Sequence, residues 1–557
     1  MSEAWLQTSE KSRKFVGHSS CRCAMSCTSL SEHTGLNGAA RITPMRSTRA
    51  MRFRTWMLAV FVATLTTPAL AAAGGVVGDG TPGSCTEAAL DAALAGGGSI
   101  TFNCGASPVT ITVTSAKNVT KSTSLDGGGL ITLSGGGTTQ LFVVNTKHVT
   151  LSLENVTISD GLAAGSPTRG GAIYSKGTLN VANSTFANNT APSSDGGSDG
   201  GAIFNLGALS VTDSTFNNNT AVSNTNNTFA GGGAIFSAGV LRVSSSTFSN
   251  NSASAGNGAI GFGGAIQNLG TASVASGTFL SNSSGSAFGG GAICNMDKLS
   301  VSNSTFANNT SPNGSGGAIY NFGPTLSATN STFTNNSAAL AGGAIESEAD
   351  SAPPSAAGKV TVVGCTFAGN SASEAGAIDN IIGRLTVTNS TFADNSASVE
   401  GGAIYNFDQL TAASSTFFDN TSANGAGAAI DNAGTASAKN TIIATTTSDE
   451  NCLGGLTDKG HNIDSGASCG FSHTHGSLSS TDPQLDPAGL ADNGGPTQTV
   501  AVEAGSPAIN AGNESACKAA PVKGVDQRGF ARPGTGSSSC TIGAYEFNSP
   551  GPRSGAR

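Results

Sequence analysis

The stretch "GGAIYSKGTLNVANSTFANNTA" occupies residues 170–191, and variations of it continue to about residue 432. Aligned on the GGAI element, the repeats place an isoleucine at Ile173, Ile203, Ile235, Ile266, Ile293, Ile319, Ile345, Ile378, Ile404 and Ile430. The intervals between these residues run from 26 to 33 residues. A recurrence of this length is typical of a solenoid or an array, in which each repeat packs against its neighbours.

The interior of each repeat alternates apolar and polar residues, as Leu179 and Val181 do in the first copy. This alternation indicates short strands, and no stretch offers a helical stripe. We therefore predict an all-β protein with a right-handed parallel β-helix of the pectin-lyase-like type, whose coils stack about 4.8 Å apart. The invariant Ile is expected to face the core, and the variable residue after it to face outward.

Two further columns recur in register. The Phe of the "STF" element is followed three residues later by Asn in nine repeats, as in Phe186 and Asn189. We expect the phenylalanines to form a stacked aromatic core. The asparagines are expected to form an amide ladder at a corner where the backbone is left-handed.

The alternation of GGAI with F-x-x-N over roughly residues 155–432 resembles the repeat of the polymorphic outer membrane proteins of chlamydiae. The resemblance implies a cell-surface adhesin. Those proteins end in a membrane β-barrel, whereas this chain ends in the polar "NSPGPRSGAR". Translocation by a barrel of its own is therefore not implied.

The beginning of the chain is predicted to be removed. Residues 51–73 have a basic start at Met51, an apolar centre and a small-x-small site, which together indicate a signal peptide. A membrane anchor is the competing interpretation, but the apolar run is short of the roughly 20 residues that a spanning helix needs. Residues 1–50 are interpreted as an over-extension of the start site. We expect a secreted, cell-surface or outer-membrane-associated protein with no transmembrane span in the mature chain.

Removal of residues 1–73 would change the net charge and the number of cysteines. From residue 74 onward the chain has 17 Lys and Arg against 31 Asp and Glu, a net charge of −14. Nucleic acid is therefore not an expected partner. Eight cysteines remain, an even number that suits disulfides in an exported protein.

Residues 74–160 are predicted to form an N-terminal cap and irregular opening coils. A short helix is expected over residues 86–95, followed by a strand that ends near Cys104. A disulfide between Cys85 and Cys104 would hold this cap over the open end of the repeat β-helix, which is assigned to residues 161–440.

Residues 441–547 do not follow the repeat pattern. The elements "LADNGGPTQT", "GSPAINAG", "DQRGFARP" and "IGAYEF" resemble the choice-of-anchor Q module of exported bacterial β-helix proteins. Within it we expect disulfides between Cys452 and Cys469 and between Cys517 and Cys540. A zinc site with His461, His473 and His475 is the alternative. Cys294 and Cys365 are interpreted as unpaired, and residues 548–557 as a disordered tail.

Acidic residues gather in the later repeats. The position after the core Ile holds Glu346, Asp379 and Asp431, and Glu374 and Glu400 fall in register on adjacent coils. Stacked carboxylates raise one another's pKa, and such a set can bind Ca²⁺ or act as acid and base. A solvated face without function is the plainer interpretation. The insertion "SEADSAPPSAAG" (347–358) lies beside this acidic column.

Two functions of different class remain open. The first is a non-catalytic adhesin or scaffold that binds a glycan or the cell envelope, and we favour it. The second is a polysaccharide lyase or hydrolase that uses the acidic column, with Glu346, Asp379 and Asp431 as candidate catalytic residues. No cofactor is expected apart from possible calcium, and a monomer is expected. An outward aromatic column, Tyr174, Phe204, Phe236 and Tyr320, is interpreted either as plain surface or as a sugar-stacking face.

Overall fold

The computed structural model describes residues 74–552, except 166–167, 194–195, 226–227, 257–258, 349–357, 424, 426 and 448–449. The predicted over-extension, the signal peptide, most of the insertion after Glu348 and residues 553–557 of the tail lie outside these ranges. Within the described part no helix is long and apolar enough to cross a lipid bilayer.

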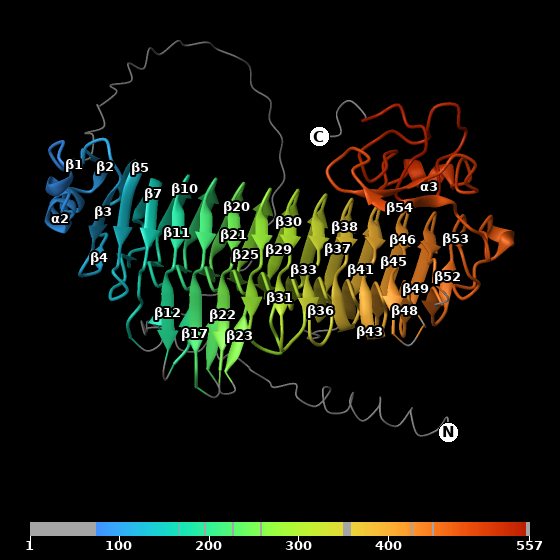
Figure 1. The fold of residues 1–557 in the computed structure, drawn as a ribbon, viewed down its shortest axis with the longest axis horizontal. Helices are drawn as coiled ribbons and strands as arrows, with labels where there is room; N and C mark the ends of the chain where they lie inside the picture. The colour runs from blue at the N-terminus through green and yellow to red at the C-terminus, as the bar shows by residue number, and fades with distance from the viewer. Residues whose placement is uncertain are drawn as a thin grey trace, which may run out of the picture. The chain divides into compact units, whose positions relative to one another are not determined.

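The described chain winds into a parallel β-solenoid, so the predicted β-helix architecture is confirmed (Figure 1). Four parallel sheets run along it. The Ile-x-Asn segments form a 13-stranded sheet, here sheet B. Its strands are β4 (Lys117–Asn118), β6 (Phe142–Val144), β9 (Ile173–Ser175), β14 (Ile203–Asn205), β19 (Ile235–Ser237), β24 (Ile266–Asn268), β28 (Ile293–Asn295), β32 (Ile319–Asn321), β36 (Ile345–Glu348), β40 (Ile378–Ile382), β44 (Ile404–Asn406), β48 (Ile430–Asn432) and β51 (Cys452–Leu453).

Sheet A contributes two strands to each repeat. The longer ones carry the alternating Leu/Val positions: β10 (Thr178–Ala182), β15 (Ala208–Thr212), β20 (Val240–Ser244), β25 (Thr271–Ala275), β29 (Lys298–Ser302), β33 (Thr325–Thr329), β37 (Lys359–Val363), β41 (Arg384–Thr388), β45 (Gln409–Ala413) and β49 (Thr435–Lys439). The shorter ones mostly carry Thr-Phe: β11 (Thr185–Ala187), β16 (Thr215–Asn217), β21 (Thr247–Ser249), β26 (Thr278–Leu280), β30 (Thr305–Ala307), β34 (Thr332–Thr334), β38 (Thr366–Ala368), β42 (Thr391–Ala393), β46 (Thr416–Phe418) and β50 (Ile442–Ala444).

The ends of sheet A are β1 (Gly75–Val77), β2 (Gly98–Phe102), β3 (Val109–Thr112), β5 (Thr123–Ser134), β7 (Thr150–Ser159), β52 (Leu456–Asp458) and β53 (Ile463–Asp464). Sheet C follows the Asn corner and comprises β12 (Thr190–Ser193), β17 (Thr220–Ser223), β22 (Ser252–Ala255), β27 (Ser283–Ser284), β31 (Thr310–Ser311), β35 (Ser337–Ala338), β39 (Ser371–Glu374), β43 (Ser396–Glu400) and β47 (Thr421–Ser422). In the early coils a fourth sheet, sheet D, adds β8 (Thr168–Arg169), β13 (Ser198–Asp199), β18 (Phe229–Gly231) and β23 (Ile260–Phe262).

The core consists of the columns that the repeat predicts. Every repeat Ile and every Phe of the Thr-Phe strands is buried. Consecutive Phe rings stack with centroids 4.6 to 5.0 Å apart, a spacing that follows from the step between parallel strands. The predicted aromatic stack is therefore confirmed.

The predicted asparagine ladder is also confirmed. It runs without a break from Asn189 to Asn420, each amide nitrogen donating to the next amide oxygen at 2.8 to 3.0 Å. The left-handed residue at this corner, however, is the one before the ladder asparagine, such as Asn188 with φ 56° or Asn308 with φ 55°. The preceding residue adopts the left-handed backbone of the turn, and the ladder asparagine forms hydrogen bonds to the neighbouring coils.

The N-terminal cap is built around α2 (Glu87–Gly96), whose first turn is capped by Thr86. The disulfide between Cys85 and Cys104 ties the short 3₁₀ turn η1 (Pro82–Ser84) and the start of α2 to the end of β2. Lys117 of β4 forms ion pairs with Glu87 at 2.6 Å and Asp91 at 2.7 Å. These contacts close the first coils with a covalent bond and a charged cluster.

The last part of the described chain folds against sheet A. It contains η3 (His473–His475), the antiparallel pair β54 (Leu485–Ala491) and β55 (Thr499–Val502), and α3 (Glu514–Lys518). The predicted disulfide pairs, Cys452 with Cys469 and Cys517 with Cys540, are both present. Cys294 and Cys365 are unpaired and buried.

The motif "DQRGFARP" supplies the contact between this module and the coils. Gln527 accepts a hydrogen bond from Thr391 at 2.6 Å and donates to Thr366 at 2.9 Å. Arg532 and Glu546 form a fully buried ion pair at 3.3 Å. This ion pair is buried inside the module, and Gln527 helps to hold the module on the coils.

Candidate functional site

The acidic column lies on sheet B. Glu346 of β36 and Asp379 of β40 are direct neighbours in the strand register, so the predicted juxtaposition of these two carboxyls is found. Asp431 of β48 is separated from Asp379 by Tyr405 of β44. Three positions of one column therefore form one acidic pair and one acidic residue two coils away.

The expected outward exposure of this column is wrong. Glu346 is 2% exposed, Asp379 1% and Asp431 5%. The aromatic residues of the same column that were expected at the surface are mostly covered too, because Phe204, Phe236 and Tyr320 are buried. These side chains point away from the Ile core but do not reach solvent, so neither a solvated acidic face nor a sugar-stacking face is present here.

A corner, with glycine at its left-handed position in most repeats, precedes each repeat Ile and lies close to the strand that carries the column. At Gly342, where φ is 61°, an added Cβ would lie 2.4 Å from the Ile345 carbonyl oxygen and 2.8 Å from the Glu346 nitrogen. The corner backbone thus folds directly onto the following strand. In the early coils the Arg169 guanidinium of sheet D also lies over the Phe204 ring, 5.0 Å from its centroid.

One corner beside the acidic pair has no glycine at its left-handed position. Ala375 occupies the position of the corner glycine with φ 53°, although a Cβ there makes left-handed backbone unfavourable. We expect Ala375→Gly to raise the thermal unfolding midpoint, because it removes about 1 kcal/mol of backbone strain. The reciprocal Gly342→Ala should lower the midpoint, since its Cβ meets backbone. A lower midpoint for Ala375→Gly would contradict this interpretation.

Burial dominates the electrostatics of the pair. It raises the pKa of Glu346 well above its ordinary value, and the Asp379 charge raises it further. Burial also raises the pKa of Asp379, followed by the charge of Glu374, while a hydrogen bond from the Glu346 carboxyl opposes the rise. The pair is therefore a buried carboxyl dyad whose protonated forms are favoured in the folded protein.

Tyr320 and Glu348 lie beside the dyad, and the sequence analysis did not identify either as part of the site. Tyr320 donates a hydrogen bond of 2.6 Å to Glu348, and burial, followed by the Glu348 charge, raises the pKa of Tyr320. Strand alternation places Glu348 on the same face as Glu346, so this signal was available. Tyr320 was named only as a surface aromatic.

The predicted neighbours Glu374 and Glu400 pair in register on sheet C, across β39 and β43. They lie on a different sheet from the dyad, and Glu374 influences both dyad carboxyls electrostatically. In the part of the chain that the structure describes, no group of three or more His, Cys, Asp or Glu has the arrangement of a metal site. The five acidic residues considered for calcium therefore do not form one ligand shell.

A second asparagine ladder follows the core side of sheet B and is interrupted beside the dyad. Asn295 donates to Asn321 and Asn380 donates to Asn406, both at 2.7 Å, but Ser347 stands between the two runs. The Ser347 hydroxyl and the Asn380 amide oxygen are buried without a hydrogen-bond partner among the described residues. The acidic pair thus sits where the regular polar network of the coil fails.

Restoring this ladder should stabilise the protein. We expect Ser347→Asn to raise the unfolding free energy by about 1 kcal/mol, because its amide can pair with both Asn321 and Asn380. Ser300→Asn, on the exposed face of sheet A, is the matched control and should change little. Equal chemical-denaturation midpoints for the two variants would contradict this account of the gap.

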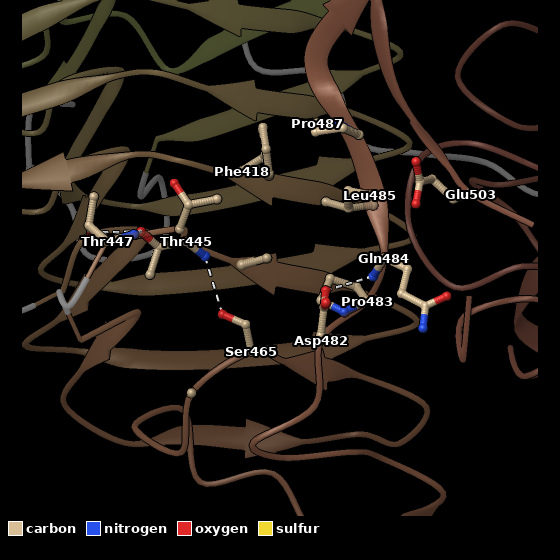
Figure 2. Close-up of a pocket in the computed structure, with 13 residues that line it drawn as sticks. Phe418, Thr445, Thr447, Ser465, Asp482, Pro483, Gln484, Leu485, Pro487 and Glu503 are labelled. Carbon is tan, nitrogen blue, oxygen red and sulfur yellow. Dashed lines mark hydrogen bonds between the residues drawn. The ribbon is translucent and has the colours of Figure 1, made fainter. Parts of the chain in front are cut away.

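A separate pocket lies where the C-terminal module meets the last coils (Figure 2). It has a volume of about 670 Å³ and is lined from one side by Phe418, Thr445 and Ser465 and from the other by residues 482–485, Pro487 and Glu503. Hydroxyls, carboxyls and an aromatic ring can bind a hydroxyl-rich molecule. Sequence reasoning missed this pocket because its walls come from segments that only the docking of the module brings together.

A family model now identifies the repeat. The model of the Chlamydia polymorphic membrane protein repeat matches residues 183–206, 303–321, 330–348 and 389–406. The chain contains Chlamydia polymorphic membrane protein repeats. Each matched segment runs from just before the Thr-Phe strand to the Ile strand of sheet B, so it includes one stacked Phe and one ladder Asn. No curated protein and no solved structure matches the chain.

The matched segments of these polymorphic membrane protein repeats include residues from the Ile, Phe and Asn columns. In residues 303–321 they are Phe306 in the aromatic stack, Asn309 in the ladder and Ile319 in the core. All three are fully buried. The matched segment therefore contains residues that stack one coil on the next.

Proposed function

We propose that this protein is an exported, cell-surface β-solenoid that binds a glycan or another component of a cell envelope and does not act as an enzyme. The observation that carries the proposal is that four segments of the solenoid match the polymorphic membrane protein repeat, whose family name places its members at a membrane. A long solenoid offers an extended binding surface.

The two ends of the chain fit this role. A signal peptide beginning at Met51 would export the protein. Residues 441–547, which resemble a choice-of-anchor Q module, would then retain it at the surface. The three disulfides support an oxidising compartment, because such bonds are rare in the reducing cytosol.

Catalysis at the acidic column is the weaker candidate. The raised pKa of the Glu346–Asp379 dyad is what a general acid requires. A polysaccharide, however, must reach the proton it receives, and these two side chains are almost fully covered. Burial thus argues against a lyase or hydrolase that uses Glu346, Asp379 or Asp431 in this conformation.

One experiment separates binding from catalysis. The purified protein is incubated with acidic and neutral polysaccharides, with Ca²⁺ or EDTA, while polymer length and binding are both followed. We expect binding with unchanged polymer length. Shortened chains, with shortening abolished by Glu346→Gln and Asp379→Asn, would overturn the proposal in favour of an enzyme. Absence of binding to every polysaccharide and to intact cells would overturn it as well.

A further inference from the structure

The cations of the repeat region are concentrated on one face. Residues 161–440 contain seven Lys and Arg, and five of them lie on the longer strands of sheet A: Arg242, Lys298, Lys359, Arg384 and Lys439. None of these ten strands contains Asp or Glu. This face is therefore positive on a chain whose residues 74–557 carry 31 acidic against 17 basic residues.

The strand register aligns these cations along the stacking direction. Lys298 pairs with Thr325, which pairs with Lys359, and Lys359 pairs with Arg384. With coils about 4.8 Å apart, Lys298 and Lys359 are about 10 Å apart, and Arg384 follows about 5 Å further on. Arg242 lies one coil before Ser273, on the neighbouring outward row. We call Lys298, Lys359 and Arg384 the cationic row.

The cationic row is available to a ligand. Its three side chains and that of Arg242 are exposed, and among the described residues none of these four forms an ion pair. Asp297, which precedes Lys298 in the sequence, and Asp408, which accepts a hydrogen bond from the Gly383 backbone, both lie in the turns before the strands. The positive charges are therefore not neutralised within the described face.

A shallow groove lies beside Lys298 and Lys359. It has a volume of about 480 Å³ and is lined by Lys298, Lys359 and the outward hydroxyls of β25, β29, β33 and β37. Those hydroxyls include Ser273, Ser300 and Ser327, which share one row across neighbouring coils. The groove thus alternates fixed positive charges with hydrogen-bonding groups along the solenoid.

We propose that this face binds a linear acidic polysaccharide that lies across the strands, parallel to the stack of coils. Its acidic groups would pair with the cationic row and its hydroxyls with the serine row, because one sugar of an extended chain is about as long as one coil step. Nucleic acid is disfavoured, since the groove lacks the aromatic side chains on which bases stack. This inference rests on the proposed glycan-binding function and names its ligand class.

The test uses fluorescence anisotropy with a labelled oligogalacturonate, a sulfated heparin oligosaccharide, a neutral dextran oligosaccharide and a single-stranded oligonucleotide. We expect saturable binding of an acidic sugar that weakens with salt, because ion pairing releases counterions. The triple variant Lys298→Gln, Lys359→Gln, Arg384→Gln should weaken this binding about tenfold and flatten its salt dependence. The carboxylated and sulfated sugars show which anionic group is preferred.

A matched control removes the same charge elsewhere. Lys121→Gln, Lys518→Gln, Lys523→Gln changes exposed lysines of the cap and the C-terminal module, and it should leave the affinity unchanged. Equal weakening in both triple variants, or equally tight binding of the oligonucleotide, would overturn the proposed site. Binding of neutral dextran alone would overturn the site but leave the glycan-binding function standing. No binding of any sugar or of cells would overturn both.

Discussion

Replacing Asn309 by alanine is expected to lower the free energy of unfolding by about 4 kcal/mol, because it leaves several buried polar groups without partners. The Asn309 amide oxygen accepts from the backbone and the side chain of Asn282, at 3.1 and 3.0 Å. Its amide nitrogen donates to the Phe279 carbonyl at 3.0 Å and to Asn336 at 2.9 Å. All four bonds lie in the buried interior of the solenoid, where water cannot replace them.

Two measurements check this prediction. Guanidinium denaturation gives the loss of stability, and amide hydrogen exchange shows whether the loss spreads from Asn282 to the adjacent coils, as expected for a solenoid in which each repeat contacts only its neighbours. Asn308→Gly is the matched control, because it removes an asparagine from the same turn while keeping the left-handed backbone. If Asn309→Ala behaved like this control, the ladder would not stabilise the stack.

The stability of the protein is expected to fall as the pH rises. The pKa values of Glu346 and Asp379 are raised in the folded protein, so folding favours their protonated forms. The resulting stabilisation is fully present below about pH 4, where the carboxyls of the unfolded chain titrate, and is lost as the pH rises through the folded pKa values. Each additional proton retained by the folded state costs about 1.4 kcal/mol of stability per pH unit.

The double variant Glu346→Gln, Asp379→Asn should remove most of this dependence. We expect it to match the parent protein near pH 4 and to exceed it in unfolding midpoint at pH 8 to 9, because neutral amides carry no charge into the buried site. Asp492→Asn, at an exposed carboxyl, is the control and should follow the parent. Parallel stability curves for the double variant and the parent between pH 4 and pH 9 would contradict the dyad.

The dyad also bears on the choice between functions. A buried pair that must keep its proton destabilises the fold at neutral pH, and Ala375 adds backbone strain at the next corner. The gap in the asparagine ladder at Ser347 lies on the same strand as Glu346. The dyad, Ala375 and Ser347 are three departures from the repeat, and all lie on two neighbouring coils. The cationic row lies on sheet A, so the glycan binding proposed for it does not depend on these departures.

The repeat alone determined the architecture. Its columns of Ile, Phe and Asn return with a fixed spacing, and a side chain that recurs in register on every coil must contact copies of itself. The burial of Phe306, the ladder through Asn309 and the parallel pairing of strands were therefore predictable. The local cysteine pairs, such as Cys85 and Cys104, were predictable because few residues separate them.

Only the tertiary structure decided what lies outside the core. Strand alternation predicts that Glu346 and Asp379 point away from Ile345 and Ile378, but it does not say what covers them. The corner before each Ile lies close to the backbone of the following strand, and the column that was expected at the surface is buried. The junction pocket likewise depends on where the C-terminal module docks, because contacts between distant segments leave no periodic signal in the sequence.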